Sequence, residues 1–149
     1  MDEDNRNLLL QDLSSRIPYG VKVAVNQSEL QNYDYKWKNW SFDEEPQEID
    51  GVSIYGVTFG SMDMSDGVIG FEYIKPYLFP LSSMTEEQKT FFDDKHIDID
   101  DILGIVAIFA HVNCEEWIEI IDWLNKNHFD YRGLIGKSLA LDATNLNIY

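Results

Sequence analysis

Three histidines close to acidic residues or to the sole cysteine are the side chains best suited to chemistry in this sequence. They occur in His96-Ile-Asp98-Ile-Asp100-Asp101, as His111 near Cys114, and in His128-Phe-Asp130. Side chains on a β-strand alternate between two faces, so His96, Asp98 and Asp100 would point to the same side. Imidazole and carboxylate groups both bind divalent metals. One hypothesis is therefore a small metal-dependent enzyme that uses the His96–Asp101 cluster.

The competing interpretation of this cluster is an acidic, solvated segment that contains an incidental histidine. A metal site needs ligands that converge from a second element, and a Cys–His enzyme needs that pair in contact beside an oxyanion site. The sequence indicates neither. It also has no phosphate-binding glycine-rich loop, nucleophile elbow or zinc-protease helix. We therefore expect a protein with no catalytic residue, no cofactor and no bound metal.

Acidity is the outstanding property of the composition. The 149 residues include 11 Lys and Arg against 27 Asp and Glu, a formal net charge of −16 at pH 7. Phosphate backbones and anionic lipids repel such a chain, which disfavours direct binding to nucleic acid or membranes. The charge then serves either solubility or the attraction of a basic partner.

Aromatic residues beside an acidic stretch predict a protein-binding face, because interfaces combine Trp and Tyr anchors with a charged rim. The candidate residues are the anchors Trp37, Trp40 and Tyr77 and the acids Asp43, Glu44, Glu45 and Glu48. Lysines interleaved with these aromatics could also stack single-stranded bases, but the net charge opposes that function. The leading hypothesis is a non-catalytic acidic binding protein that acts through protein–protein contacts, for example on a basic, nucleic-acid-binding protein. An immunity-type inhibitor of a toxin is a further alternative.

The run from Asn113 to Asn127 predicts the best-defined helix. Asn113 and Glu116 form a capping box at its start, and Asn127 is a left-handed stop at its end. Apolar residues at three- and four-residue intervals should form one buried stripe: Trp117, Ile120, Ile121 and Leu124, with Ile118 on its flank. The opposite face should meet water: Glu115, Glu119, Asp122 and Lys126.

Patterns in the first half of the chain predict one helix and several strands. The helix runs from Asn5 to Ile17, begins at Asp4 or Asn5 and is stopped by Pro18. Alternation predicts one strand at Val21–Val25 and an aromatic strand from Tyr33 to Phe42. An acidic loop at Asp43–Asp50 should follow.

The middle of the chain predicts a hairpin, an apolar strap and a short helix. Val52–Phe59 and Val68–Ile74 are β-rich runs and should form the two arms of the hairpin. Pro76 and Pro80 should end it and extend the residues between them, and a Ser83–Glu86 capping box should start the helix. The apolar run Ile102–Val112 has no decisive periodicity, although its β-branched content favours a strand over a helix.

These elements together predict an α+β fold in a single domain that spans residues 1–149. A small, mainly antiparallel sheet from the Val21–Ile74 region should be covered by the N-terminal helix and by the C-terminal amphipathic helix. The first residues lack the positive and apolar regions of a secretory signal. Because the longest apolar run is about half the length of a membrane helix, we expect a cytoplasmic protein.

Four blocks of the chain resemble a known group of proteins. In chain order they are Ile17–Lys22, Lys75–Glu87, Trp123–Ile135 and Leu139–Ala143, under half of the sequence. They are similar to an uncharacterised family of small acidic proteins encoded in phages and prophage-like elements of gut anaerobes. The resemblance implies a cytoplasmic protein of a mobile element, and it implies no site residues.

Overall fold

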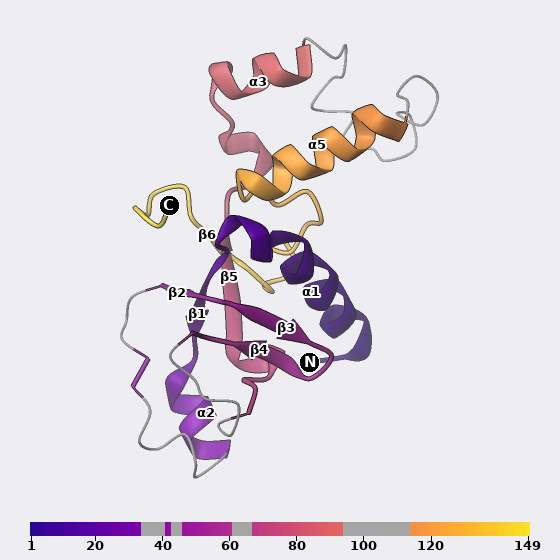
Figure 1. Ribbon diagram of the computed structural model, residues 1–149. Coiled ribbons are helices and arrows are strands. Elements are labelled where there is room, and N and C mark those ends of the chain that lie inside the picture. Colours follow the sequence, from indigo (N-terminus) through magenta and orange to yellow (C-terminus); the bar gives the residue numbers. More distant parts are fainter. Residues whose placement is uncertain (34–40, 43–45, 61–66, 94–113) are drawn as a thin grey trace.

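The computed structural model describes residues 1–33, 41–42, 46–60, 67–93 and 114–149 (Figure 1). These residues form helices and short strands. They are α1 (Glu3–Arg16), β1 (Lys22–Val25), α2 (Gln27–Tyr33), β2 (Gln47–Glu48), β3 (Gly51–Ser53), β4 (Gly56–Thr58), β5 (Ile74–Leu78), α3 (Glu86–Asp93), α5 (Cys114–Lys126) and β6 (Leu141–Asp142). The predicted α+β class is confirmed.

Strands β2, β1, β5 and β6 form the main sheet in that order. β1 is antiparallel to both of its neighbours, with Lys22 opposite Glu48 in β2 and Val23 opposite Pro76 in β5. β6 is parallel to β5 and pairs with it from Tyr77 onward. Pro76, expected to end a hairpin, therefore lies inside a strand, and the β6 ladder starts only after it.

Helix α1 begins earlier than predicted. Asp2 is its N-cap, because the Asp2 side chain accepts a hydrogen bond from the Asn5 N–H group at 2.8 Å. Asp4, one of the two predicted starts, instead lies in the first turn, where the helix dipole favours an acid. The helix ends at Arg16, and a 3-10 turn that contains Pro18 follows, as the proline indicated.

Helix α2 replaces the start of the predicted aromatic strand. Asn26 precedes this helix, and its Oδ1 atom accepts hydrogen bonds from Ser28 Oγ at 3.0 Å and from the Glu29 N–H group at 3.4 Å. Local capping of this kind favours a helix over a strand. Tyr33 is thus helical, and the strand prediction for 34–40 falls outside the described residues.

The predicted arm Val52–Phe59 is itself a hairpin. Strands β3 and β4 pair within it, and the turn between them consists of Ile54 and Tyr55. Gly56, after the turn, has φ +151°, and a Cβ atom there would lie 2.0 Å from the Ile69 carbonyl oxygen. Only glycine allows this close approach, which brings the second predicted arm beside β4 through the Val57–Ile69 bridge.

Two shorter predictions also need correction. The acidic stretch 43–50 is not all loop, because Gln47 and Glu48 form β2. The capping box of α3 is Thr85 with Gln88 rather than Ser83 with Glu86. The Gln88 N–H group donates to Thr85 Oγ1 at 3.2 Å, and the Thr85 N–H group donates to Gln88 Oε1 at 2.9 Å. The Ser83 hydroxyl donates instead to the Pro80 carbonyl.

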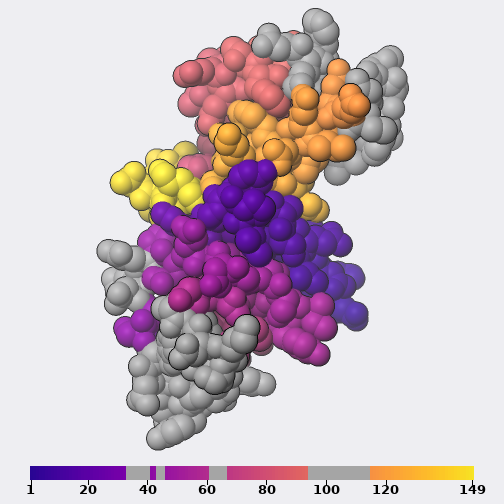
Figure 2. Space-filling model, in the orientation of Figure 1, coloured from indigo at the N-terminus to yellow at the C-terminus, as the bar shows by residue number. Residues whose placement is uncertain are grey.

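Buried apolar side chains form two clusters. The first joins α1 to the sheet and includes Leu9, Leu13, Val21, Val23 and Leu78. The second joins α3, α5 and the residues around them: Leu81, Met84, Phe92, Ile120, Leu124 and Phe129. In the space-filling view, α3 and α5 form the upper part of the molecule, and α1 and the strands lie below them (Figure 2). No helix in the described ranges is long and apolar enough to cross a membrane.

Helix α5 follows most of its predicted pattern. Ile120 and Leu124 are fully buried, and the four residues predicted to face water are exposed. Trp123, absent from the predicted stripe, stacks between Phe91 and Phe129, with ring centroids 4.9 and 5.6 Å apart. The predicted cap Asn113 lies outside the described residues.

Candidate functional site

The residues predicted to carry function are only partly described. The metal candidates His96, Asp98 and Asp100 lie outside the described residues, as do Trp37, Trp40, Asp43, Glu44 and Glu45. Within the described ranges, no three His, Cys, Asp or Glu side chains are grouped as metal ligands. Tyr77 and Glu48 are described: Tyr77 is half-buried in β5, and Glu48 is exposed in β2.

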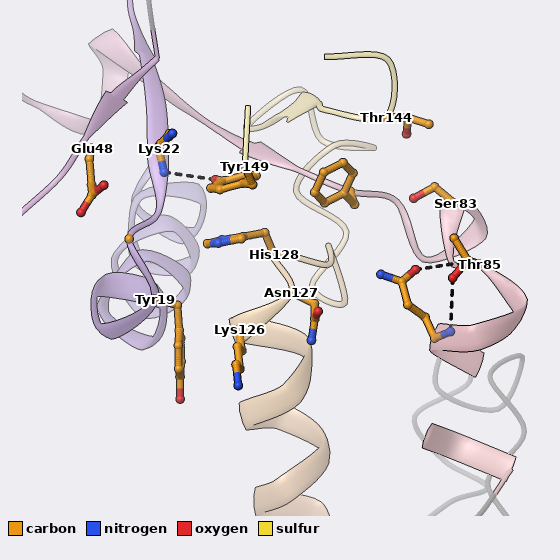
Figure 3. A pocket seen from close by; sticks show the side chains of 13 residues that line it. Tyr19, Lys22, Glu48, Ser83, Thr85, Lys126, Asn127, His128, Thr144 and Tyr149 are labelled. Carbon is orange, nitrogen blue, oxygen red and sulfur yellow. Dashed lines mark hydrogen bonds between the residues drawn. The ribbon is translucent and has the colours of Figure 1, made fainter. Parts of the chain in front are cut away.

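A pocket of about 650 Å³ lies where four separate segments meet (Figure 3). We call it the junction pocket. It is lined by residues of the β1 and β2 region, of the segment that leads into α3, of the end of α5 and of the last residues of the chain: Tyr19, Gly20, Lys22, Glu48, Phe79, Ser83, Thr85, Gln88, Lys126, Asn127, His128, Thr144 and Tyr149. The volume is in the range of small-molecule sites.

The end of α5 places His128 in this pocket. α5 ends at Lys126, and the left-handed residue beyond it is His128, with φ +56°, rather than the predicted Asn127. The His128 carbonyl oxygen then accepts a hydrogen bond from the Phe79 N–H group at 2.9 Å, and the Asp130 N–H group donates to the Phe79 carbonyl at 2.8 Å. These two bonds fix the chain after α5 against the chain after β5.

Asp130 holds the next turn. Its two carboxylate oxygens accept hydrogen bonds from the N–H groups of Leu134 and Ile135, both at 2.8 Å. Arg132, in the same turn, reaches Asp12 of α1, with 3.4 Å between Arg132 Nε and Asp12 Oδ1. The turn therefore also connects the end of α5 to α1.

Tyr149 covers His128 from the other side of the pocket. The two rings are stacked, with centroids 3.7 Å apart and planes inclined by 9°. The Tyr149 hydroxyl accepts a hydrogen bond from the Lys22 N–H group at 3.1 Å and donates one to the Tyr77 carbonyl at 2.9 Å. The Lys22 ammonium group donates to the Ile148 carbonyl at 2.7 Å. Lys22 thus fixes the last residues of the chain on β1.

Both stacked rings are neutral at pH 7. The pKa of His128 is lowered to about 4, chiefly by burial and also by the positive charges of Arg16 and Lys22, while a hydrogen bond with the Tyr19 backbone opposes the shift. Burial is also the main reason that the pKa of Tyr149 is raised to about 12. His128 Nδ1 is buried and has no hydrogen-bond partner among the described residues.

The neutral His128 predicts a pH dependence of stability. Because its pKa of about 4 in the folded protein lies below the ordinary value of 6.5, the unfolded chain binds more protons between these pH values. The melting temperature should therefore fall as the pH decreases from 6.5 towards 4. His128→Asn should show a smaller fall between pH 7 and pH 5, since Asn tolerates the left-handed conformation and does not titrate. Equal falls in both proteins, measured by circular dichroism, would contradict this assignment.

Two charged side chains of the junction pocket have no partner in the described structure. The ammonium group of Lys126 and the carboxylate of Glu48 are exposed, and neither forms a hydrogen bond or an ion pair with a described residue. Lys126 comes from the last turn of α5 and Glu48 from β2. The pocket therefore presents one cationic and one anionic side chain without a partner among the described residues, beside the Lys22 ammonium group that is bonded to the Ile148 carbonyl.

A second surface lies on the outer side of α5. Ile118 is 70% exposed, and it lies three residues after Glu115 and four before Asp122, positions that are neighbours on a helix. Half-buried Ile121 lies beside it. A shallow apolar depression of about 330 Å³ is lined by Trp117, Ile118, Ile121, Asp122 and Asn125. We call Glu115, Ile118, Ile121 and Asp122 the outer face of α5. Asp122 also accepts a hydrogen bond from the Tyr19 hydroxyl, which raises the pKa of Tyr19.

Sequence reasoning found neither surface as a site. It placed Ile118 on the flank of the buried stripe, and it considered His128 only as a neighbour of Asp130. The sequence did contain a signal that Ile118 is exposed. On a helical projection Ile118 lies 60° from Glu115, nearer to the face that meets water than to the buried stripe. The junction pocket had no such signal, since its lining comes from residues up to 130 positions apart. No family model, no curated protein and no solved structure matches this chain.

Proposed function

We propose that this protein is a non-catalytic binding protein that acts through protein–protein contacts with a basic partner. The observation that supports this proposal is the outer face of α5. There the exposed Ile118 lies between the carboxylates of Glu115 and Asp122. An apolar anchor with an acidic rim is the composition expected of one half of an interface.

Burial of Ile118 in a complex would be favourable. Transfer of a side chain of this size from water into an apolar socket contributes about 1.5–3 kcal/mol. The net charge of −16 adds a long-range attraction for a basic surface and speeds the encounter. The matching partner therefore has an apolar socket with Lys or Arg around it. If the protein belongs to a mobile element, as its resemblance implies, the element or its host encodes that partner.

The first test of this function is capture by variants of the outer face. Wild-type protein should retain a basic protein from a bacterial lysate, and Ile118→Ser should lose at least tenfold of that capture. Ile54→Ser is the matched control, because Ile54 is 61% exposed on the β3–β4 turn, away from α5. Mass spectrometry of the eluates identifies the partner.

The second test measures association rates of the captured partner. The rate should fall steeply as salt increases, since charges are screened beyond about 10 Å at 0.1 M. Ile118→Ser should mainly speed dissociation, because short-range contacts control that rate. Equal capture by Ile118→Ser and wild type, or an association rate independent of salt, would contradict the proposal.

A further inference from the structure

We propose that the junction pocket binds a small zwitterion of the amino-acid type, either a free amino acid or a short peptide. In this proposal Lys126 binds the carboxylate of the ligand and Glu48 binds its ammonium group. The site is separate from the outer face of α5, so the inference does not depend on the proposed protein partner.

The charges of the lining carry this inference. The whole chain has 27 acids and 11 basic residues, whereas the pocket lining contains Lys22, Lys126 and one acid, Glu48. The Lys22 ammonium group donates to the Ile148 carbonyl, which holds it at the wall of the pocket and leaves its positive charge in place. A ligand with only an anionic group would leave Glu48 without a counter-charge, and a ligand with only a cationic group would leave the lysines without one. A molecule with both charges satisfies both side chains.

The positions of these charges fit a ligand that lies across the pocket. Figure 3 shows Glu48 on the β1 side of the Tyr149–His128 stack and Lys126 on the α5 side. The close-up also shows Thr85 on the far wall, towards α3. Thr85 Oγ1 accepts from the Gln88 N–H group, so its own O–H group can donate to a ligand.

His128 supplies an independent reason to expect a polar ligand. It is 5% exposed, it lines the pocket, and its Nδ1 atom has no hydrogen-bond partner among the described residues. A buried polar atom without a partner is destabilising, and proteins rarely retain one without a role. The left-handed backbone at His128 adds to that destabilisation. A ligand amide, ammonium or bridging water would give Nδ1 its missing partner.

The test is isothermal titration calorimetry with defined probes. The probes are the twenty free amino acids, Gly-Gly and Gly-Gly-Gly as zwitterions, with acetate and ethylamine as ligands of a single charge. We expect saturable binding of at least one zwitterion and at least tenfold weaker binding of acetate and ethylamine. Tighter binding of the peptides than of the amino acids identifies a peptide site, and the reverse order an amino-acid site.

Variants of the two charged residues decide whether binding occurs in the junction pocket. Lys126→Met and Glu48→Gln should each weaken binding at least tenfold. Lys137→Met and Glu72→Gln make the same charge changes at exposed positions outside the pocket and should leave affinity unchanged. The proposal is overturned if no zwitterion binds at 10 mM, which is about the weakest affinity that can be measured. It is also overturned if acetate binds as tightly as the zwitterions, or if the Lys126→Met and Glu48→Gln variants bind like wild type. Ile118→Ser should bind the zwitterion normally, which separates this result from the protein-binding function.

Discussion

Replacing Arg16 with Met should lower the free energy of unfolding by about 3–5 kcal/mol. Arg16 is fully buried, and its guanidinium group donates to both carboxylate oxygens of Asp12, at 2.8 and 3.0 Å. It also donates to the Phe129 carbonyl at 2.8 Å, just after the end of α5. The variant would leave the buried Asp12 carboxylate with only the longer Arg132 contact and would leave the Phe129 carbonyl without this donor.

Urea denaturation checks this prediction, and a double variant separates its causes. Asp12→Leu combined with Arg16→Met removes both charges, so it should be more stable than Arg16→Met alone, because an apolar pair can replace a buried ion pair at little cost. Arg6→Met is the control, since Arg6 is exposed on the same helix. A loss below about 1 kcal/mol for Arg16→Met would show that the buried network contributes little.

Replacing Leu124 with Ala should cost about 2–5 kcal/mol. Leu124 is fully buried in the cluster that joins α3 and α5, beside Ile120 and Phe129. The substitution leaves a cavity between elements that are already fixed by the Trp123 stack, so the cavity can close only partly. Chemical denaturation with a two-state fit measures the loss.

Lys126→Ala, two residues further along α5, is the matched comparison for Leu124→Ala. Lys126 is exposed and has no partner among the described residues, so its loss should cost less than about 0.5 kcal/mol. Equal small effects at both positions would contradict the orientation of α5. Trp117 is half-buried, so Trp117→Ala should fall between the two.

The sequence determined those features that depend on neighbours within a few residues. The faces of α5 follow from the spacing of Ile120 and Leu124 against its acids, because an α-helix repeats every 3.6 residues whatever it packs against. The Asp130 turn is also local, because the Asp130 carboxylate accepts hydrogen bonds from N–H groups that are only four and five residues further along the chain. Errors in the caps were small: Asp2, Asp4 and Asn5 all have suitable side chains, and only the backbone decides which one caps.

The strand predictions were less accurate, because an alternating pattern predicts which face of a strand is buried but not which other strand it pairs with. Val52–Phe59 is rich in β-forming residues as one strand would be, yet Gly56 allows it to turn back on itself as β3 and β4. Strand β6 pairs with β5 from more than sixty residues away, and nothing near Leu141 indicates that partner. Pairing over such separations depends on the whole chain packing together.

Tertiary structure alone decided the role of Arg16 and the existence of the junction pocket. A charged residue near the end of an amphipathic helix is usually solvated, and Arg16 is buried only because Asp12, Phe129 and Leu124 meet around it, the latter two more than 100 residues away. In the same way, Tyr149 reaches Lys22 across 127 positions to cover His128. Such contacts leave no periodic trace in the sequence, because they depend on which surfaces meet and not on the spacing of residues within either segment.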